Sequence, residues 1–266
     1  WNENAIQIVA GPCSVESEEQ LFATARGLKK IGIQTLRGGI WKPRSRAHHF
    51  EGVGEPGLRW LQQVQQELSM QVATEVATPR QAEVALKYGI DILWIGARTT
   101  VSPFMIQEIA EVLRGVDTPV MLKNPVCPDL ELWTGAVERL LDIDLKQLSL
   151  IHRGFSVLDA APYRNIPCLE MALEMKKRFP GLPLFCDPSH ICGKRGLLYG
   201  ICAEALRLDM DGLFIESHCC PEVALSDAAQ QLTPEALGKM FENLGIRQVE
   251  NNKLHLGCEI LIQRKG

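Results

Sequence analysis

Eight short apolar runs alternate with helical patterns along this chain. The runs are rich in β-branched residues, which is typical of parallel strands buried on both faces. We expect strands at residues 6–10, 34–37, 71–75, 91–95, 119–123, 147–152, 183–186 and 211–216. Eight alternating units within 266 residues predict a single-domain (β/α)8 TIM barrel. A doubly wound open sheet is the alternative, but no G-x-G-x-x-G turn follows the first run, IQIVA.

The segments between these runs carry helix start and stop signals. Ser17 and Gln20 form a capping box, and Gly32 lies where the helix that follows should end. Three further helices should each begin at an N-cap residue followed by proline, at Thr78-Pro79, Ser102-Pro103 and Thr233-Pro234. We assign residues 1–245 to the barrel and 246–266 to a C-terminal tail of undefined role.

Charge and cysteine content exclude several classes of protein. The net charge of -4 provides no basic face for nucleic acid. No apolar run approaches the ~20 residues that a membrane-spanning helix requires, and the N-terminus does not resemble a signal peptide. The nine cysteines are scattered without a C-x-x-C motif, which is typical of reduced thiols. We therefore expect a cytoplasmic enzyme.

Polar or metal-ligating side chains follow all eight predicted strands. In a barrel, these strand ends converge on one mouth, where active sites are built. The residues concerned are Cys13, Arg37, Glu75, Arg98, Lys123, Arg153, Asp187 with His190, and Glu216.

The charges at this predicted mouth allow two interpretations. They could pair with one another in a structural network. If some of the acids hold a metal, however, the cations are in excess, and that excess favours a substrate with several phosphate or carboxylate oxygens. The cations are Arg37, Lys42, Arg44, Arg98, Lys123 and Arg153, and the acids are Glu75, Asp187, Glu216 and Asp227.

A candidate metal site consists of Cys13, His190, Glu216 and Asp227. Taken singly, each has a structural explanation as a core thiol, a capped histidine, a strand-end acid or a helix cap. Together they come from the first, seventh and eighth predicted strands, which are neighbours in a closed barrel. Mixed sulfur, nitrogen and oxygen ligands suit Mn, Fe, Co or Zn, and the sequence does not select among them.

The remaining histidines receive weaker assignments. His48 and His49 lie in a polar loop and should face solvent. His152 precedes Arg153 and should therefore point the other way, into packing. His218, two residues after Glu216, should point with it across the barrel mouth.

At this level of detail the chain resembles a known family, the type I β subgroup of 3-deoxy-D-arabino-heptulosonate 7-phosphate (DAHP) synthases. The resemblance runs from about residue 6 to 245. The K-P-R and GARTT motifs favour DAHP synthase over the related KDO8P synthases, whose loop usually carries K-A-N-R. The motifs, in chain order, are IVAGPCSVES, K-P-R, GARTT, Lys123, RG at 153–154, YRN at 163–165, DPSH-x-x-G-K-R and IESH…P…ALSDAAQQL.

The resemblance implies condensation of phosphoenolpyruvate with erythrose 4-phosphate. It places a divalent metal on Cys13, His190, Glu216 and Asp227, and a proton-donating role on Lys42, so that Lys42, Cys13 and His190 are the expected catalytic residues. The substrate-binding residues that it implies are Arg37, Lys42, Pro43, Arg44, Ser45, Glu75, Gly96, Ala97, Arg98, Lys123 and Arg153.

Three alternatives stay open. A KDO8P synthase would use arabinose 5-phosphate as the aldehyde, a Schiff-base aldolase would use Lys123 as its nucleophile, and a silent barrel would bind phosphosugars without turnover. The resemblance also implies a homodimer or homotetramer. The chain lacks the feedback-control appendages of many family members, so we expect either no regulation or regulation by a chorismate mutase partner or a missing domain.

Overall fold

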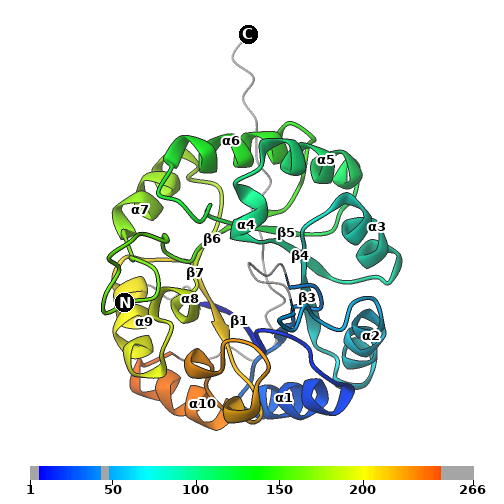
Figure 1. The fold of residues 1–266 in the computed structure, drawn as a ribbon, viewed down its shortest axis with the longest axis vertical. Coiled ribbons are helices and arrows are strands. Elements are labelled where there is room, and N and C mark those ends of the chain that lie inside the picture. The colour runs from blue at the N-terminus through cyan, green and yellow to red at the C-terminus, as the bar shows by residue number, and fades with distance from the viewer. Residues whose placement is uncertain (1–5, 43–47, 247–266) are drawn as a thin grey trace.

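The computed structural model describes residues 6–42 and 48–246, and within them eight parallel strands close into a barrel in chain order (Figure 1). Closure is made by β1 and β8, which pair from Gln7 opposite Gly212 to Gly11 opposite Glu216. The strands are β1 Gln7–Gly11, β2 Thr35–Arg37, β3 Gln71–Val76, β4 Ile92–Ile95, β5 Val120–Lys123, β6 Leu148–His152, β7 Leu184–Cys186 and β8 Gly212–Glu216.

Most helices surround the barrel in an outer ring, and the two short helices that directly follow β4 and β7 lie inside that ring (Figure 1). Three short 3-10 turns, Arg195–Leu197, Pro221–Val223 and Ala228–Gln230, lie in the loops around β7 and β8. The helices are α1 Glu18–Lys30, α2 Pro56–Leu68, α3 Pro79–Lys87, α4 Ala97–Thr100, α5 Pro103–Leu113, α6 Leu130–Leu141, α7 Leu169–Arg178, α8 Pro188–Cys192, α9 Leu198–Arg207 and α10 Pro234–Asn243.

The (β/α)8 prediction is confirmed, and each predicted strand boundary lies within one residue of the observed one. The predicted N-caps are also confirmed, since Ser17, Thr78, Ser102 and Thr233 each accept a hydrogen bond from the backbone N–H three residues later. One detail differs: the side chain of Gln20 accepts from the backbone N–H of Glu16 and not from that of the N-cap residue. The predicted tail lies mostly outside the described residues, so the boundary at 245 stays a prediction.

Two apolar cores hold the barrel together. The larger one packs the outer faces of the strands against the helices. The smaller one fills the barrel interior, where Trp94 and Phe214 meet edge to face with ring centroids 5.2 Å apart. The interior is therefore a packed floor beneath the mouth, and its buried members are Val9, Ala73, Ile92, Trp94, Met121, Ile151, Phe185 and Phe214.

Of the helices that the structure describes, none is long and apolar enough to cross a membrane.

Candidate active site

The carboxyl ends of the strands surround one pocket of about 620 Å³, a volume that includes its open mouth. Six of its lining residues are cations and two are carboxylates. Most of the residues expected at the strand ends line it together, which confirms that they lie near one another. The lining residues are Arg37, Lys42, Glu75, Gly96, Ala97, Arg98, Lys123, Arg153, Arg164, His190 and Asp227.

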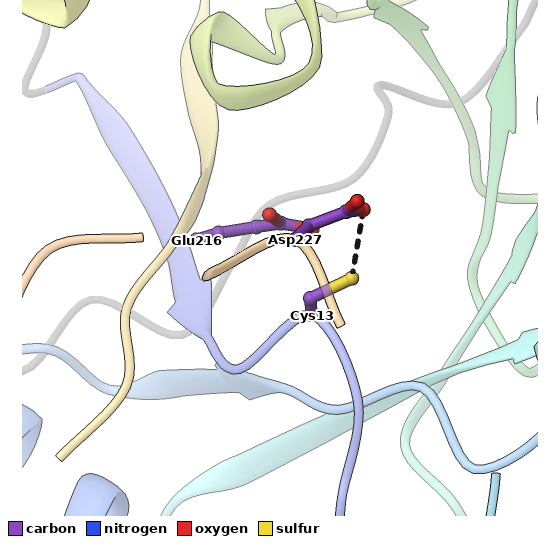
Figure 2. A group of neighbouring side chains, drawn as sticks. All are labelled: Cys13, Glu216 and Asp227. Carbon is purple, nitrogen blue, oxygen red and sulfur yellow. Dashed lines mark hydrogen bonds between the residues drawn. The ribbon is translucent and has the colours of Figure 1, made fainter. Parts of the chain in front are cut away.

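Three of the four predicted metal ligands form a tight cluster on one side of this pocket. The ligand atoms of Cys13, Glu216 and Asp227 all lie within 4.8 Å of one another. Figure 2 shows the thiol and the two carboxylates converging from separate segments, with the Cys13 thiol donating to Asp227 Oδ2 at 3.2 Å. Sulfur and carboxylate oxygen at such spacing suit a divalent transition metal.

His190 lies beside this cluster and can complete it. Its Nε2 atom is 3.7 Å from Glu216 Oε1 and 4.0 Å from Asp227 Oδ2. Its other ring nitrogen, Nδ1, is 2.8 Å from Asp187 Oδ2, and burial lowers the pKa of the imidazole. A carboxylate behind Nδ1 fixes the ring orientation in the way that metal-binding histidines require, with Nε2 directed at the cluster.

The thiol of Cys13 is protonated in the metal-free protein. Burial, together with the nearby carboxylate of Glu216, raises its pKa far above the ordinary value for cysteine. Because a thiolate is the form that binds metals, binding at this site must release the Cys13 proton.

Asp227 is held in place from several sides. Burial alone would raise its pKa, but His190 and Arg164 hold that pKa well below its usual range, so the group is a carboxylate. Its backbone is left-handed, with φ of 50°, a conformation that aspartate tolerates better than most residues. This conformation begins the 3-10 turn that follows and directs the side chain at Cys13.

Arg37 connects the metal cluster to the cationic part of the pocket. Its Nη2 donates to Glu216 Oε1 at 3.2 Å, and the guanidinium lies over the rings of Trp94 and Phe214 at 4.9 and 4.4 Å. Only 1% of the residue is exposed, and its Nε and Nη1 atoms have no hydrogen-bond partner among the described residues. A buried unpartnered donor costs about 1–3 kcal/mol, so this arginine is arranged for an additional acceptor.

Lys123 and Asp187 form a buried ion pair at the pocket floor. Lys123 Nζ donates to Asp187 Oδ2 at 2.7 Å and lies 5.0 Å from the centroid of the Phe214 ring. Burial lowers the pKa of Lys123. Burial alone would raise the pKa of Asp187, but His190 and Lys123 hold it well below its usual range. Asp187 thus contacts both the predicted metal ligand and the predicted substrate-binding lysine.

Lys42 lies between the metal cluster and Glu75. Its Nζ donates to the backbone oxygen of Cys13 at 3.2 Å and is 4.0 Å from Glu75 Oε2. Burial lowers the pKa of Lys42, but Cys13, Glu75 and Glu216 more than offset this and raise it. Gly96 allows the Glu75 carboxylate to sit there, because a Cβ at position 96 would lie 2.1 Å from Glu75 Oε1. The raised pKa keeps the Lys42 ammonium protonated.

Arg153 is the deepest arginine on the β6 side. It is 8% exposed, and its Nη1 donates to Asn165 Oδ1 at 2.8 Å. Burial lowers its pKa to about 10, which leaves it charged at neutral pH. Arg98, which follows β4, is more exposed and borders the same pocket.

One further residue belongs to the site and was not assigned to it from the chemistry of the sequence. Arg164 donates to Asp227 Oδ1 at 3.0 Å and to Gln230 Oε1 at 2.9 Å. It lies in the long connection between β6 and α7, and a loop of that length is a signal that could have identified it. Asp187 was recognised as a strand-end acid, but its contact with the imidazole of His190 depends on the three-dimensional structure.

The other predictions have mixed outcomes. Pro43, Arg44 and Ser45 lie outside the described residues, so their roles stay predictions. His152 packs away from the mouth against Trp133, with ring centroids 6.1 Å apart, as expected.

The prediction for His218 is wrong, because its ring does not cross the mouth. It is 2% exposed and lies 3.6 Å from Glu16, outside the pocket. After β8 the backbone N–H of His218 donates to Leu232, which lies outside the barrel strands, so the pairing of the barrel does not set the side-chain direction at position 218.

The fold and the site define a (β/α)8-barrel enzyme with a cationic pocket beside a potential metal cluster. A sequence model of the DAHP synthetase I family matches residues 2–249. The chain therefore belongs to the DAHP synthetase I family, which confirms the resemblance seen in its motifs.

Individual relatives agree with this assignment. The chain is 31% identical over 241 residues to phospho-2-dehydro-3-deoxyheptonate aldolase of Thermotoga maritima, covering 89% of this chain and 68% of that protein. A crystal structure of DAHP synthase from Thermotoga maritima matches with a TM-score of 0.81 and 30% identity, covering 91% of this chain and 69% of that one. A 2-dehydro-3-deoxyphosphooctonate aldolase of Nitrosococcus oceani is 29% identical over 264 residues, covering 91% of this chain and 89% of that protein.

Proposed function

We propose that this enzyme condenses phosphoenolpyruvate with erythrose 4-phosphate to give DAHP and inorganic phosphate, the first step of the shikimate pathway. The observation that carries the proposal is the pocket itself, in which six cations lie beside a Cys–Glu–Asp cluster. The two substrates together bring two phosphates, one carboxylate and one aldehyde. The cations are suited to the anionic groups, and the cluster is suited to the aldehyde.

Phosphoenolpyruvate would occupy the cationic part of the pocket. Lys123 and Arg153 are buried charges at its floor, and Arg98 borders it near the opening. The unpartnered Nε and Nη1 atoms of Arg37 are donors for a carboxylate or phosphate oxygen. These groups hold the phosphate from binding until it leaves, and they stabilise the charge that develops on it.

The metal would be held by Cys13, His190, Glu216 and Asp227. Sulfur, imidazole and carboxylate ligands fit Mn, Fe, Co or Zn. When bound, such an ion supplies Lewis acidity to an aldehyde oxygen. Asp187 would orient His190 for this role through Nδ1.

Lys42 is the candidate proton donor of the condensation. The methylene carbon of phosphoenolpyruvate forms a bond to the aldehyde carbon, and the aldehyde oxygen takes a proton from Lys42 Nζ. Water adds at the neighbouring carbon and returns one proton to Lys42. The bond from that carbon to the phosphate oxygen then breaks, and the leaving phosphate takes the remaining hydroxyl proton as the ketone forms. Lys42 lies next to Cys13 and Glu75, between the cluster and the cations, which is the location that such a donor needs.

An activity assay with a chelator tests the proposal. Phosphoenolpyruvate consumption is followed with erythrose 4-phosphate as the aldehyde, after EDTA treatment and after Mn²⁺ is added back. We expect consumption to stop with EDTA and to return with metal. Metal-independent activity, or trapping of an enzyme adduct by borohydride, would support a Schiff base on Lys123 instead. Consumption only with arabinose 5-phosphate would identify a KDO8P synthase.

We also propose a cytoplasmic location and assembly as a homodimer or homotetramer, on the resemblance to the family. The same resemblance suggests regulation through a chorismate mutase partner or domain. Gel filtration of the chain alone tests whether it forms a homodimer or homotetramer, since a monomeric elution volume would contradict both.

A further inference from the structure

The loop after β8 connects two members of the metal cluster. It begins at Glu216, the last residue of β8, and reaches Asp227 eleven residues later. The third member, Cys13, lies in the separate loop between β1 and α1. The spacing of the three ligands therefore depends on how these two loops are fixed to each other.

One carboxylate outside the pocket contacts the β8 loop near both of its ends. Glu16, three residues after Cys13, accepts a hydrogen bond at Oε1 from the backbone N–H of Leu225, at 2.8 Å. Its Oε2 lies 3.6 Å from Nε2 of His218. Leu225 lies two residues before Asp227, and His218 lies two residues after Glu216, so each contact is close to one residue of the metal cluster. Movement of Glu16 would thus be transmitted to both.

The tautomer of His218 follows from its other ring nitrogen. Nδ1 accepts a hydrogen bond from the backbone N–H of Cys220 at 2.9 Å, so the ring proton is on Nε2. This Nε2 atom makes no hydrogen bond among the described residues, and the carboxylate beside it is that of Glu16, with Oε2 at 3.6 Å. His218 is 2% exposed, so water does not compete for this contact.

Two other contacts join the same pair of loops. The hydroxyls of Ser14 and Ser226 are 2.5 Å apart, and the backbone N–H of Cys13 donates to Gln231 Oε1 at 3.0 Å. They connect backbone and short side chains next to the ligands themselves. The Glu16 carboxylate differs from these contacts because it reaches both ends of the β8 loop, at Leu225 and at His218.

We propose that Glu16 and His218 are positioning residues that set the spacing of Cys13, Glu216 and Asp227 for the metal. Neither touches the pocket, so they act through the two loops and not on the substrate. This inference rests on the proposed metal role of the cluster. Groups that orient metal ligands typically affect metal affinity by about 10–100-fold when they are changed.

Direct measurement of Mn²⁺ binding tests the inference without reference to activity. The full chain is freed of metal with EDTA and titrated with Mn²⁺, and free Mn²⁺ is followed by electron paramagnetic resonance. Glu16→Gln keeps an oxygen for Leu225 but can turn an amide N–H toward His218. His218→Asn keeps an acceptor for Cys220 but is too short to reach Glu16. We expect each to weaken Mn²⁺ binding by about tenfold or more.

Three further variants distinguish positioning from general damage. His218→Gln can extend an N–H toward Glu16 and should recover part of the affinity. The double variant with Glu16→Gln and His218→Asn should be no weaker than the weaker single variant, because both remove the same contact. Glu18→Gln, in the first turn of α1, removes a carboxylate that does not contact the β8 loop in the described part of the chain, and it should bind Mn²⁺ like the wild type.

The outcomes separate this inference from the proposed function. Wild-type affinity in both single variants, no recovery with His218→Gln, or additive losses in the double variant would overturn the positioning role alone. Absence of Mn²⁺ binding by the wild type would overturn the metal function and, with it, this inference.

Discussion

The barrel mouth has two halves that treat charge in opposite ways. The metal half, named for its proposed role, consists of Cys13, His190, Glu216 and Asp227. It brings acidic side chains close together, and burial raises the pKa of its thiol. The cation half consists of Arg37, Arg98, Lys123 and Arg153. In it, Arg37 and Lys123 lie against aromatic rings, and Lys123 pairs with a buried carboxylate.

The difference shows what each half lacks. Clustered carboxylates lack a positive charge, and clustered arginines and lysines lack a negative one. Two residues connect the halves and partly balance their charge. Arg37 pairs with Glu216 of the metal half, and Asp187 contacts both Lys123 and His190. Under the proposed function, two ligands would complete the site at once, a metal on one side and a multiply charged anion on the other.

The largest effect is expected from removing a ligand in the metal half. Cys13→Ala should reduce activity at least about 10³-fold, because Lewis-acid catalysis contributes several kcal/mol. The assay is phosphoenolpyruvate consumption with Mn²⁺ present. Cys202→Ala, which removes a thiol equally buried on α9, should leave the rate near that of the wild type. Equal rates for the two variants would remove the distinction between the halves.

The second-largest effect is expected on stability, from breaking the ion pair between Lys123 and Asp187, where the two halves meet. Lys123→Met leaves Asp187 buried without its lysine, and we expect the free energy of unfolding to fall by about 3 kcal/mol. Urea unfolding measures this. Adding Asp187→Asn should restore much of the stability but not the activity. Full stability in the single variant would show that His190 alone compensates Asp187.

His152, the last residue of β6, tests whether buried charge matters for stability away from the mouth as well. Its side chain is buried against Trp133, and burial lowers its pKa to about 4, below the ordinary value near 6.5. As pH falls below about 6.5, the unfolded chain takes up a proton that the folded chain refuses, so stability should fall by about 2 kcal/mol between pH 7 and pH 5.

Urea unfolding of His152→Gln at the same two pH values isolates this contribution. The variant keeps a donor near the Pro167 oxygen but does not titrate, so it should lose about 2 kcal/mol less than the wild type. Parallel losses in both proteins would assign the acid sensitivity to other groups.

The smallest effect should come from a conservative change in the cation half. Arg153→Lys keeps the charge but loses the planar fork that can bind Asn165 and a substrate oxygen together. We expect the KM for phosphoenolpyruvate to rise about tenfold, equivalent to about 1.4 kcal/mol. Arg139→Lys, on α6 away from the pocket, should leave KM unchanged. Unchanged KM in both would show that charge alone suffices at position 153.

Most of the fold was predictable because its signals are local. Apolar β-branched runs and Ser/Thr-Pro caps are read within a few residues, and all the predicted strands are present. The charges at the strand ends were predictable for the same reason, once eight strands implied one mouth. The metal cluster needed only the further step that strands one, seven and eight are neighbours in a closed barrel.

The side-chain directions that could not be predicted from the sequence depend on contacts between distant segments. Arg164 reaches Asp227 across 63 positions of the chain, and no local pattern directs its side chain there. His218 follows a strand, but its backbone pairs with Leu232 outside the barrel, so the alternation from which its direction was predicted does not apply. Both cases concern loops, where side-chain direction is set by tertiary packing and not by a regular backbone period.

The closure of the barrel by β1 and β8 has a consequence for the order in which the protein matures during synthesis. Cys13 emerges from the ribosome more than two hundred positions before Glu216 and Asp227, and the three meet only after the last strand pairs with the first. A nascent chain that has not reached β8 thus has no assembled metal cluster. Under the proposed function, metal binding would therefore report that the barrel has closed, and a chain that has not reached β8 would not hold the metal at this site.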